Sequence, residues 1–368
     1  MNFALNKKVL IAIPRFTVGG AEIQALNLAK ELKNRGYNVV IGAFGSEAGE
    51  GYVKFTKAGL DCIHWGFQEK IILNPEKGLI GWSRKYRYCL NIIIKVRSLN
   101  VDYIIPFTYP SNVIFCRLIR WLNVKKCIWN QRDAGILFTG KKNEISALNN
   151  ASVIVSNSLE GLKFLRRYVR KKIFHIPNGI DMGLYPSHND IIKYLKVIMV
   201  GNVIDLKDHT TLIKAWKLVL IEFPNFQLIF AGYKGNKFNE CEKLAIELGI
   251  ENSIEFMGIV ENVPNLLRRC YLAVFSSYNE GLPNGILEPM AAGLPVVASN
   301  IQGSREALGD HYEFLVEPQN HEQFAIKIIC LLKDKVLREK IGKENLLRVS
   351  SSFSLKNMVD EYERILSV

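Results

Sequence analysis

The residues with the most evident chemical potential lie in one stretch of the second half of the chain, EGLPNGILE. Glu280 and Glu288 flank seven residues, and the glycines between them indicate a turn into a helix from about Pro283 to Ala292. Main-chain amides at the start of that helix would face a bound phosphate or sugar. Glu288 can accept hydrogen bonds from vicinal ribose hydroxyls. A solvated surface glutamate is the alternative, but the PMAAG that follows is apolar.

A lysine precedes a predicted helix in the segment MVGNVIDLKDHTTLIKAW. Gly201 directly follows a predicted strand, and Lys207 stands at the start of the helix. An ammonium group at the mouth of a sheet can neutralise a diphosphate leaving group, which matters most where no metal ion does so. Lysines at helix starts are usually only solvated, so the residues alone leave both interpretations open.

Two turns that contain glycine, both in the first half of the chain, could also contact a ligand. RFTVGGAE joins a predicted strand to a helix, and Gly19 and Gly20 allow a turn that brings an anion to the helix N-terminus. The spacing is neither that of a P-loop nor GxGxxG, so a plain connecting turn is an equal alternative. In FHIPNGID, residues 174–181, a strand end precedes a Pro-Asn-Gly turn, which we interpret as a hinge at a domain boundary.

Both halves alternate short apolar runs with longer periodic segments, which is the pattern of parallel sheets covered by helices. The pattern predicts an α/β protein with two doubly wound domains, and a ligand outside the carboxyl ends of their strands. A length of 368 residues agrees with two domains of about 150 residues or more. The linker is predicted from Asp181 to Leu195. The predicted strands are Val9–Pro14, Val39–Phe44, Cys62–Trp65, Tyr103–Phe107, Cys127–Asn130, Val153–Ser156, Val197–Val200, Phe226–Ala231, Ile254–Met257, Leu272–Ser276 and Pro295–Ala298.

Composition argues against several classes of protein. No stretch reaches about 18 uncharged apolar residues, so a membrane-spanning helix is not expected. Lys7 and Lys8 directly precede the first predicted strand, so we expect no signal peptide and a cytoplasmic protein. The seven cysteines are scattered and never spaced as CxxC, which predicts reduced core residues. The histidines do not have the spacing of metal ligands, and the sequence contains no Asp-x-Asp pair. We therefore expect no metal site.

The positive charge is confined to the first half of the chain. Residues 1–185 contain 28 Lys and Arg against 12 Asp and Glu, or +16, whereas residues 186–368 contain 20 against 23, or −3. The two values sum to the net charge of +13. Such asymmetry suits a surface that meets anionic lipid or a phosphorylated acceptor.

One helix of the basic half carries both apolar and cationic residues. In LIGWSRKYRYCLNIIIKVR, residues 79–97, we expect one apolar stripe to pack on the sheet and a basic face to remain outside. The basic face would favour docking on an anionic leaflet, with a lipid-linked glycan as a consistent acceptor. The stripe comprises Trp82, Tyr86, Cys89, Leu90, Ile93 and Val96, and the basic face comprises Arg84, Arg87, Asn91 and Lys95.

The order of these motifs resembles the retaining GT-B glycosyltransferases of family 4, also called group 1. The shared elements are GGAE at 19–22, IPNGID at 176–181, VGN and LK with LIKA within 200–215, the two glutamates at 280 and 288, and GLPVVAS with GSRE within 293–306. The resemblance implies two Rossmann-like domains facing across a deep cleft. It also implies a nucleotide-diphosphate sugar donor, linked to UDP or GDP, and same-face transfer to a glycan acceptor without cofactor or metal, in surface polysaccharide assembly.

The resemblance also implies a division of the chain and roles for its residues. Residues 1–182 would bind the acceptor, residues 190–350 would bind the donor, and residues 351–368 would cross back as a helix to the first domain. Glu288 would hold the ribose, Glu280 the donor sugar and Lys207 the diphosphate, with the Gly19 and Gly20 loop closing over the phosphates. The donor-binding set is Gly19, Gly20, Gly201, Asn202, Lys207, Glu280, Gly281, Leu282, Pro283, Asn284, Gly285 and Glu288, and the catalytic set is Glu280, Lys207, Asp133 and Arg132.

Two positions depart from the family pattern. Family members usually carry Arg where this chain has Asn202, so Lys207 and cations such as Arg15 or Arg305 must supply the charge, or donor turnover is weak. The residue after the fifth strand is often His in relatives, but here the chain reads IWNQRDAG. We nominate Asp133 for that position with Arg132 as its phosphate-side or acceptor-side partner, although Asp133 can instead cap the next helix.

Other functions remain as alternatives. A nucleic-acid binder would explain the basic charge but leaves the donor-site motifs unexplained, so no nucleic acid is expected as a partner. A catalytically silent sugar-nucleotide scaffold would explain Asn202. An epimerase of nucleotide sugars shares the architecture and needs no acceptor. We expect a glycosyltransferase, cytoplasmic and peripheral on the inner face of the membrane.

Overall fold

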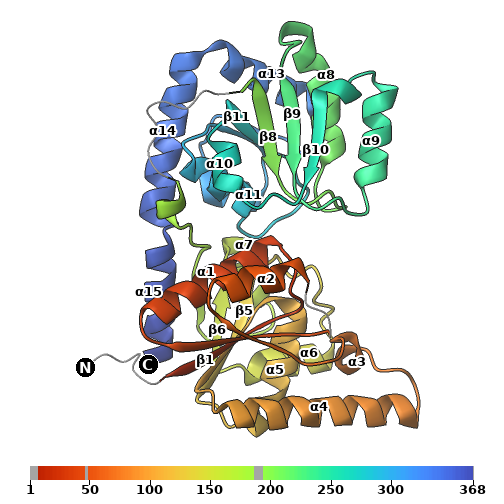
Figure 1. The fold of residues 1–368 in the computed structure, drawn as a ribbon, viewed down its shortest axis with the longest axis vertical. Helices are drawn as coiled ribbons and strands as arrows, with labels where there is room; N and C mark the ends of the chain where they lie inside the picture. The colour runs from red at the N-terminus through yellow and green to blue at the C-terminus, as the bar shows by residue number, and fades with distance from the viewer. Residues whose placement is uncertain (1–6, 46–48, 186–193, 368) are drawn as a thin grey trace. The chain divides into compact units, whose positions relative to one another are not determined.

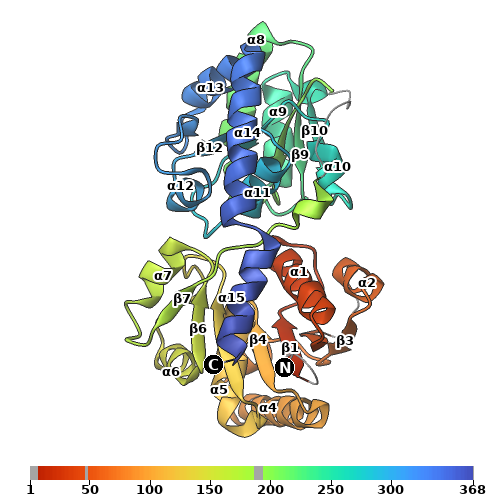
Figure 2. The same ribbon diagram turned by 90° about the vertical axis from the view of Figure 1, so that its left-hand side faces the viewer.

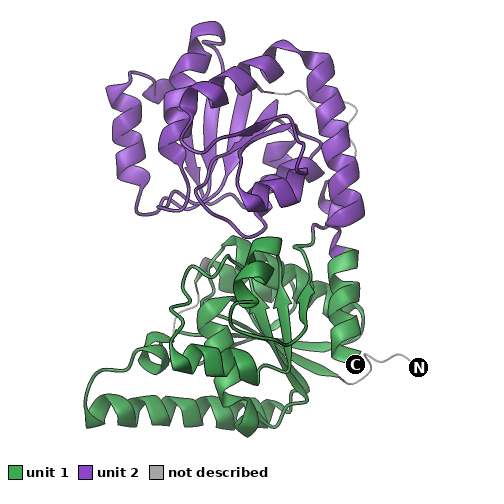
Figure 3. Ribbon diagram, turned by 180° about the vertical axis from the view of Figure 1, so that it is seen from behind, with its two compact units in different colours: residues 1–179, 356–368 green, residues 180–355 purple. Residues whose placement is uncertain are grey.

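The computed structural model describes residues 7–45, 49–185 and 194–367. It divides the chain into two compact units (Figure 3). Unit 1 comprises residues 1–179 and 356–368, and unit 2 comprises residues 180–355. In each unit, strands and helices alternate along the chain, because parallel strands are joined only by crossovers long enough to hold a helix.

Unit 1 contains a seven-stranded parallel sheet in the order β3-β2-β1-β4-β5-β6-β7 (Figure 1). Helices α1 and α2 cover one face, whereas α5 packs against both α4 and α6 on the other. The strands are β1 (Lys8–Ile13), β2 (Asn38–Ala43), β3 (Asp61–His64), β4 (Tyr103–Pro106), β5 (Lys126–Gln131), β6 (Val153–Ser156) and β7 (Ile173–His175). The helices are α1 (Gly20–Asn34), α2 (Glu50–Lys57), α3 (Lys70–Leu73), α4 (Leu79–Leu99), α5 (Thr108–Leu122), α6 (Lys142–Asn150), α7 (Leu159–Leu165) and α15 (Leu355–Ser367).

Unit 2 contains a six-stranded parallel sheet in the order β10-β9-β8-β11-β12-β13. Its strands are β8 (Lys196–Val200), β9 (Gln227–Ala231), β10 (Ile254–Gly258), β11 (Leu272–Phe275), β12 (Val296–Ser299) and β13 (Leu315–Val316). Its α-helices are α8 (His209–Glu222), α9 (Phe238–Glu247), α10 (Val263–Leu267), α11 (Asn284–Ala291), α12 (Gln302–Leu308), α13 (His321–Lys333) and α14 (Lys335–Ser352), and its 3-10 turns are η1 (Met182–Leu184) and η2 (Glu251–Ser253).

The central strands are buried on both faces, as parallel sheets require. Five of the six residues of β1 and all four residues of β11 are buried. Helices reinforce this burial with aromatic side chains. Trp65 in unit 1 contacts Phe44 and Phe115, and Trp216 in unit 2 is fully buried. The continuous apolar runs in the sequence are therefore the hydrophobic cores of the two sheets.

Helix α15 belongs to unit 1, where it lies alongside α1 (Figure 2). The Arg35 guanidinium at the end of α1 donates hydrogen bonds to the carboxylates of Asp360 and Glu363, at 2.6 and 2.5 Å. The hydroxyl of Tyr362 is fully buried and donates to Oδ1 of Asn130 on β5 at 3.0 Å. The apolar face of α15 thus completes the core of a unit whose other segment ends at Gly179.

The prediction of an α/β fold is confirmed, and every predicted strand occurs with its ends shifted by at most one residue. Strands β7 and β13 are absent from the predicted list, because they have only three and two residues. Residues 186–193 of the predicted linker lie outside the described part of the chain. The prediction for the cysteines is wrong at Cys330, which is exposed because it lies on the outer side of α13. The other cysteines are buried or half-buried, and none forms a disulfide.

The predicted packing of α4 is wrong for part of the stripe, although Val96 is buried and Cys89 and Ile93 pack against the core. Its buried face is formed by Gly81, Lys85, Ile92 and Val96, whereas Trp82, Tyr86 and Leu90 are exposed. A periodicity count treats lysine as polar and glycine as neutral, but the aliphatic stem of a lysine can be buried and a glycine permits close approach. The real packing face is therefore rotated away from the apolar stripe that the pattern predicts.

None of the helices in the described ranges is both long enough and apolar enough to cross a membrane.

Replacement of Tyr362 by Phe is expected to lower the free energy of unfolding by about 1 to 2 kcal/mol, because the buried Oδ1 of Asn130 loses its donor. Urea unfolding followed by circular dichroism measures the change. Tyr86→Phe is the control, since Tyr86 is 67% exposed and should have no effect. Equal stability of both variants would show that the Tyr362 hydroxyl does not anchor α15.

Candidate functional site

Each sheet has a point at which the strand order reverses. In unit 2 the chain proceeds from β8 through β9 to β10 on one side and from β11 through β12 to β13 on the other. The corresponding reversal in unit 1 lies between β1 and β4. Loops leave such a switch point in opposite directions, which opens a crevice at the carboxyl ends of the two strands. The predicted site residues can therefore be compared with two defined places in the fold.

The switch point of unit 2 holds Lys207 and Glu280. Lys207 follows β8 and Glu280 follows β11, and their side chains form an ion pair. The Lys207 ammonium also lies 4.2 Å from the centre of the Phe275 ring. The hydroxyl of Ser277 lies 2.9 Å from Oε1 of Glu280, so the carboxylate is held from two sides. Residues 73 positions apart thus form one polar cluster, which we call the switch-point pair.

Lys207 stands just before its helix and not within it. Helix α8 begins at His209, and Asp208 is the N-cap, whose carboxylate accepts from the Thr211 amide at 3.3 Å. Lys207 itself forms an antiparallel bridge with Ser277. This bridge joins the loops after β8 and β11 and fixes the backbone from which the Lys207 side chain extends.

The start of α11 lies directly against the end of β8. A Cβ atom on Gly285 would come 2.3 Å from the carbonyl oxygen of Val200, and one on Gly303 would come 1.9 Å from that of Gly281. Only glycine permits these approaches. Gly285 and Gly303 therefore bring the first turn of α11 and the residue before it in EGLPNG close to the switch point. Leu282 and Pro283 are buried in this turn, and Asn284 begins the helix.

Glu288 is half-buried on α11 and acts electrostatically on Tyr185. Burial, and then the negative charge of Glu288, raise the pKa of the Tyr185 hydroxyl well above its ordinary value. Glu288 is thus not the solvated surface residue of the alternative interpretation. It lies on the same short helix whose first turn meets β8.

Asn202 has a structural partner where relatives carry a cation. Its side-chain oxygen accepts a hydrogen bond from the Tyr233 amide at 3.0 Å, which joins the ends of β8 and β9. Gly201 lies beside the Lys207 stem, where a Cβ would make only an ordinary contact of 3.5 Å with its Cε. Both cations suggested as substitutes already have partners in the structure. Arg15 pairs with Glu69 at 3.4 Å, and Arg305 donates to Asn300 at 2.8 Å.

His209 was not recognised from the sequence. It is 1% exposed, and its ring lies 4.9 Å from that of Phe230. Burial and the neighbouring charge of Lys207 lower the pKa of His209 to about 4. The imidazole is therefore neutral near pH 7 and adds no positive charge beside the switch-point pair.

Gly19 and Gly20 lie at the switch point of unit 1, where Gly19 is the N-cap of α1. The carboxylate of Glu22 approaches so closely that a Cβ on Gly19 would lie 2.6 Å from its Oε2. Burial raises the pKa of Glu22, and the amides of Glu22 and Gly19 oppose that rise. The helix N-terminus that the sequence assigned to an anion thus already meets a carboxylate from its own first turn.

Arg132 and Asp133 follow β5, but they have different partners. Nη2 of Arg132 donates to Oδ1 of Asn178 in the IPNGID turn, and its guanidinium lies 5.1 Å from the Phe107 ring. Burial lowers the pKa of Arg132, whereas Tyr362 opposes that shift. Asp133 accepts from the amide of Gly135 at 2.6 Å and therefore forms a local turn. It does not cap the next helix, because α6 begins only at Lys142.

Thr108, shortly after the end of β4, has a strained main-chain conformation that we did not predict from the sequence. Thr108 has a φ of 67°, a left-handed conformation that is costly for a β-branched side chain. Its hydroxyl and that of Ser111 are buried without a hydrogen-bond partner among the described residues, as are Nε and Nη1 of Arg132. Buried polar atoms normally have partners, so this edge of unit 1 is suited to a polar ligand. No sequence signal marks it, since threonine carries no preference for this conformation.

Gln24 holds the end of the IPNGID turn. Its side-chain amide donates to the Gly179 carbonyl at 3.1 Å and accepts from the Gly179 amide at 3.0 Å. Gln24 is 1% exposed and lies on α1, two residues after GGAE. The last residue of this segment of unit 1 is thus secured to the first helix. The interpretation of residues 174–181 as a hinge remains a prediction.

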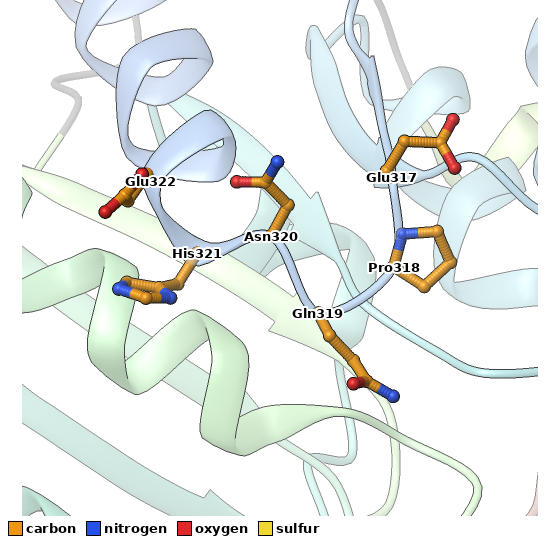
Figure 4. A pocket seen from close by; sticks show the side chains of 6 residues that line it. All are labelled: Glu317, Pro318, Gln319, Asn320, His321 and Glu322. Atoms are coloured by element: carbon orange, nitrogen blue, oxygen red, sulfur yellow. The ribbon is translucent and has the colours of Figure 1, made fainter.

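A shallow hollow lies elsewhere in unit 2 (Figure 4). It is lined by six consecutive residues that follow β13 and include the start of α13: Glu317, Pro318, Gln319, Asn320, His321 and Glu322. The positive φ of Gln319, 66°, turns the chain here, and Asn320 caps α13. The hollow follows the edge strand and contains no predicted site residue, so we assign no chemistry to it.

Two family models match consecutive parts of the chain. Residues 18–184 match Glycosyltransferase Family 4, and residues 187–347 match Glycosyl transferases group 1. An uncharacterized glycosyltransferase of Haemophilus influenzae is 24% identical over 95% of this chain and 97% of its own length.

Two further similarities extend this result. The N,N'-diacetylbacillosaminyl-diphospho-undecaprenol alpha-1,3-N-acetylgalactosaminyltransferase of Campylobacter jejuni is 27% identical over 59% of this chain and 55% of its own length. The crystal structure of Anabaena Alr3699/HepE in complex with UDP and glucose matches with a TM-score of 0.83 and 20% identity, over 98% of this chain and 100% of that chain. That second likeness shows the fold.

Two Rossmann-like units, each with a crevice at its switch point, define the GT-B class of α/β proteins. With both of its units matched in order, the chain belongs to the glycosyltransferases that carry a family 4 domain followed by a group 1 domain.

The lowered pKa of His209 predicts a specific sensitivity to acid. Its ordinary value is 6.5 and its folded value is about 4, so between these pH values the unfolded chain binds a proton that the folded chain does not. The free energy of unfolding should fall by about 2 to 3 kcal/mol as the pH falls through this window. Urea unfolding at pH 7 and pH 4.5 should show a smaller loss for His209→Leu than for the unaltered protein. His311→Leu, at an exposed position, should behave like the unaltered protein, and the same loss in all three would exclude His209 as the cause.

Proposed function

We propose that this protein transfers a sugar from a nucleotide-diphosphate donor, linked to UDP or GDP, to a lipid-linked glycan acceptor, with retention of anomeric configuration and without a metal ion. The observation that carries the proposal is the switch-point pair of Lys207 and Glu280 beside the first turn of α11. A cation, a carboxylate and helix amides together suit a ligand that combines phosphates with sugar hydroxyls. UDP in the Anabaena neighbour is consistent with such a donor.

The donor site would be assembled mainly from unit 2, and the predicted role of the Gly19 and Gly20 loop of unit 1 stays part of the proposal. Glu288 would accept hydrogen bonds from the ribose hydroxyls, and the amides of Gly281 to Gly285 would face the phosphates or the sugar. Lys207 would exchange its contact with Glu280 for the diphosphate, and the released carboxylate would accept from the sugar hydroxyls. The two members of the pair would thus hold each other in position until the donor arrives.

Catalysis would consist mainly of charge stabilisation. The bond from the anomeric carbon to the diphosphate oxygen breaks through an oxocarbenium-like state, and negative charge grows on the leaving nucleotide. Lys207 and the α11 amides stabilise that charge. The acceptor hydroxyl attacks from the same face and gives its proton to the departing phosphate oxygen, so the new glycosidic bond keeps the configuration of the old one.

The acceptor would be bound by unit 1. The buried donors of Arg132 and the hydroxyls of Thr108 and Ser111 suit a phosphate or a sugar hydroxyl, with Asp133 nearby as the polar residue of the acceptor side. The Campylobacter relative is named for an acceptor linked to diphospho-undecaprenol. An acceptor of that class and the +16 charge of residues 1–185 together favour a peripheral protein on the cytoplasmic face of an anionic membrane, in surface polysaccharide assembly.

A catalytically weak sugar-nucleotide scaffold is the second candidate, because of Asn202. Its side-chain oxygen accepts from the Tyr233 amide and supplies no positive charge to the leaving group. Such a scaffold would bind the donor but turn it over slowly. An epimerase, in contrast, would convert the donor without any acceptor.

A panel of UDP- and GDP-sugars tests these alternatives. We expect nucleotide diphosphate release to rise for one donor when a polyprenyl-diphosphate-linked glycan is added, and an NMR spectrum of the product should show the donor's anomeric configuration. The rate should survive EDTA, since Lys207 handles the charge. Full loss with EDTA and rescue by Mg²⁺ or Mn²⁺ would contradict the metal-free mechanism. Donor binding without release would favour the scaffold, and conversion of the donor alone would favour the epimerase.

Glu288→Gln is expected to weaken donor binding about tenfold to a hundredfold, because a hydrogen bond to a charged acceptor contributes about 1.5 to 3 kcal/mol. Isothermal titration with the nucleoside diphosphate measures the affinity, and circular dichroism checks the fold. Glu247→Gln on α9 is the control, since its side chain is 56% exposed and should not affect binding. Unchanged affinity of Glu288→Gln would remove Glu288 from the donor site.

A further inference from the structure

Helix α4 has an apolar face that unit 1 does not cover. Trp82, Tyr86, Leu90 and Ile94 recur every four residues and therefore lie on one side of the helix. The apolar stripe of α4 comprises Leu79, Ile80, Trp82, Tyr86, Leu90 and Ile94, whose exposed fractions range from 47% to 89%. The N-terminal half of α4 projects beyond the strands of its unit (Figures 1 and 3). Exposed apolar groups at this density normally mark an interaction surface.

The exposed tryptophans of the protein are both in this region. Trp82 is 47% exposed and Trp121, at the end of α5, is 52% exposed, whereas the other three are at most 1% exposed. Nε of Arg97 on α4 donates to the Trp121 carbonyl at 2.8 Å, so the ends of the two helices are joined. Tryptophan is enriched where apolar and aqueous phases meet, because its ring is apolar and its N–H is polar.

The charge of the same two helices has only one sign. Helices α4 and α5 contain no Asp or Glu. Their basic residues are Arg84, Lys85, Arg87, Lys95 and Arg97 on α4, and Arg117 and Arg120 on α5. Arg84 pairs with Glu76 before the helix at 3.4 Å, and because both groups are largely exposed this pair is weak. The apolar stripe is therefore bordered by cations that anionic headgroups can neutralise.

The opposite face of α4 holds the stripe in place. Ile92 and Val96 are buried in the unit 1 core, and Nζ of Lys95 lies 3.3 Å from the His64 carbonyl. Lys95 is thus engaged with the protein, so the expectation that it faces the membrane is wrong. Arg84 and Arg87 remain exposed.

We propose that α4 docks unit 1 on an anionic phospholipid bilayer, lying in the interface with its apolar stripe in the acyl boundary and Arg84 and Arg87 at the headgroups. The complementary charge of the two helices selects a membrane over an apolar protein partner. The inference rests on the proposed function in that a lipid-linked acceptor requires the enzyme to reach the membrane. It also deepens that function, because it assigns the contact to one helix rather than to the basic half as a whole.

Vesicle binding of the full-length protein tests the proposal without donor or acceptor. We expect co-sedimentation with vesicles of phosphatidylglycerol and phosphatidylcholine at low salt, and little with phosphatidylcholine alone. Vesicles that contain brominated lipid should quench the tryptophan emission, because only Trp82 and Trp121 are accessible. In Trp82→Phe the quenching should be largely lost.

Two pairs of variants separate the helix from general charge. Trp82→Ser with Tyr86→Ser and Leu90→Ser should reduce the partition coefficient at least about tenfold. Ile221→Ser with Ile246→Ser and Leu347→Ser alters equally exposed apolar residues of unit 2 and should not reduce it. Arg84→Ser with Arg87→Ser should weaken binding and its salt dependence. Arg166→Ser with Arg167→Ser removes the same charge from another exposed site of unit 1 and should have much less effect.

Equal loss with both arginine pairs would overturn the proposal, because charge alone would then explain binding. Binding without brominated-lipid quenching would overturn it as well, since the stripe would not enter the bilayer. A stripe variant that abolishes a dimer in sedimentation velocity, with vesicle binding unchanged, would assign the surface to a second copy of the chain. Donor binding measured on the same stripe variant should be unchanged, so failure of the docking surface and failure of the proposed function give different results.

Discussion

The reversal of strand order within each parallel sheet is the constraint on which the rest of the structure depends. Because the chain winds outward from β8 to one side and from β11 to the other, the loops after these two strands diverge and leave their carboxyl ends accessible. Lys207 and Glu280 meet there although 73 residues separate them. The same reversal in unit 1 brings Gly19 and the strained Thr108 to the ends of β1 and β4.

The candidate site at the switch point of unit 2 depends on close approaches between main-chain segments. Gly285 and Gly303 permit contacts with carbonyl oxygens that any side chain would prevent. The bridge between Lys207 and Ser277 then joins the two loops that carry the charged pair. The backbone positions of the two charged residues are thus fixed, and contacts of their side chains with each other, Ser277 and Phe275 hold the charged groups.

The two units differ in how their charged residues are distributed. Unit 2 holds a balanced ion pair beside a neutral His209, so a diphosphate would meet one well-defined cation. Most of the excess positive charge lies in residues 1–185, and much of it borders an apolar helix face. This difference agrees with the proposal that unit 2 binds a nucleotide sugar and unit 1 a surface-bound acceptor.

The sequence by itself determined the α/β class, the eleven main strands and the family, because apolar runs and glycine motifs reflect local backbone requirements. Only the tertiary structure decided which distant residues meet. In the structure, Lys207 forms an ion pair with Glu280, and Asn202 accepts a hydrogen bond from a main-chain amide. Asp133 accepts from the Gly135 amide in a local turn and does not cap a helix. The tertiary structure also rotated α4, because the face that packs is chosen by the fit of Gly81 and the stem of Lys85 against the unit, not by hydrophobicity alone. Periodicity counts apolar residues on a helix, whereas packing depends on the shape of what lies opposite.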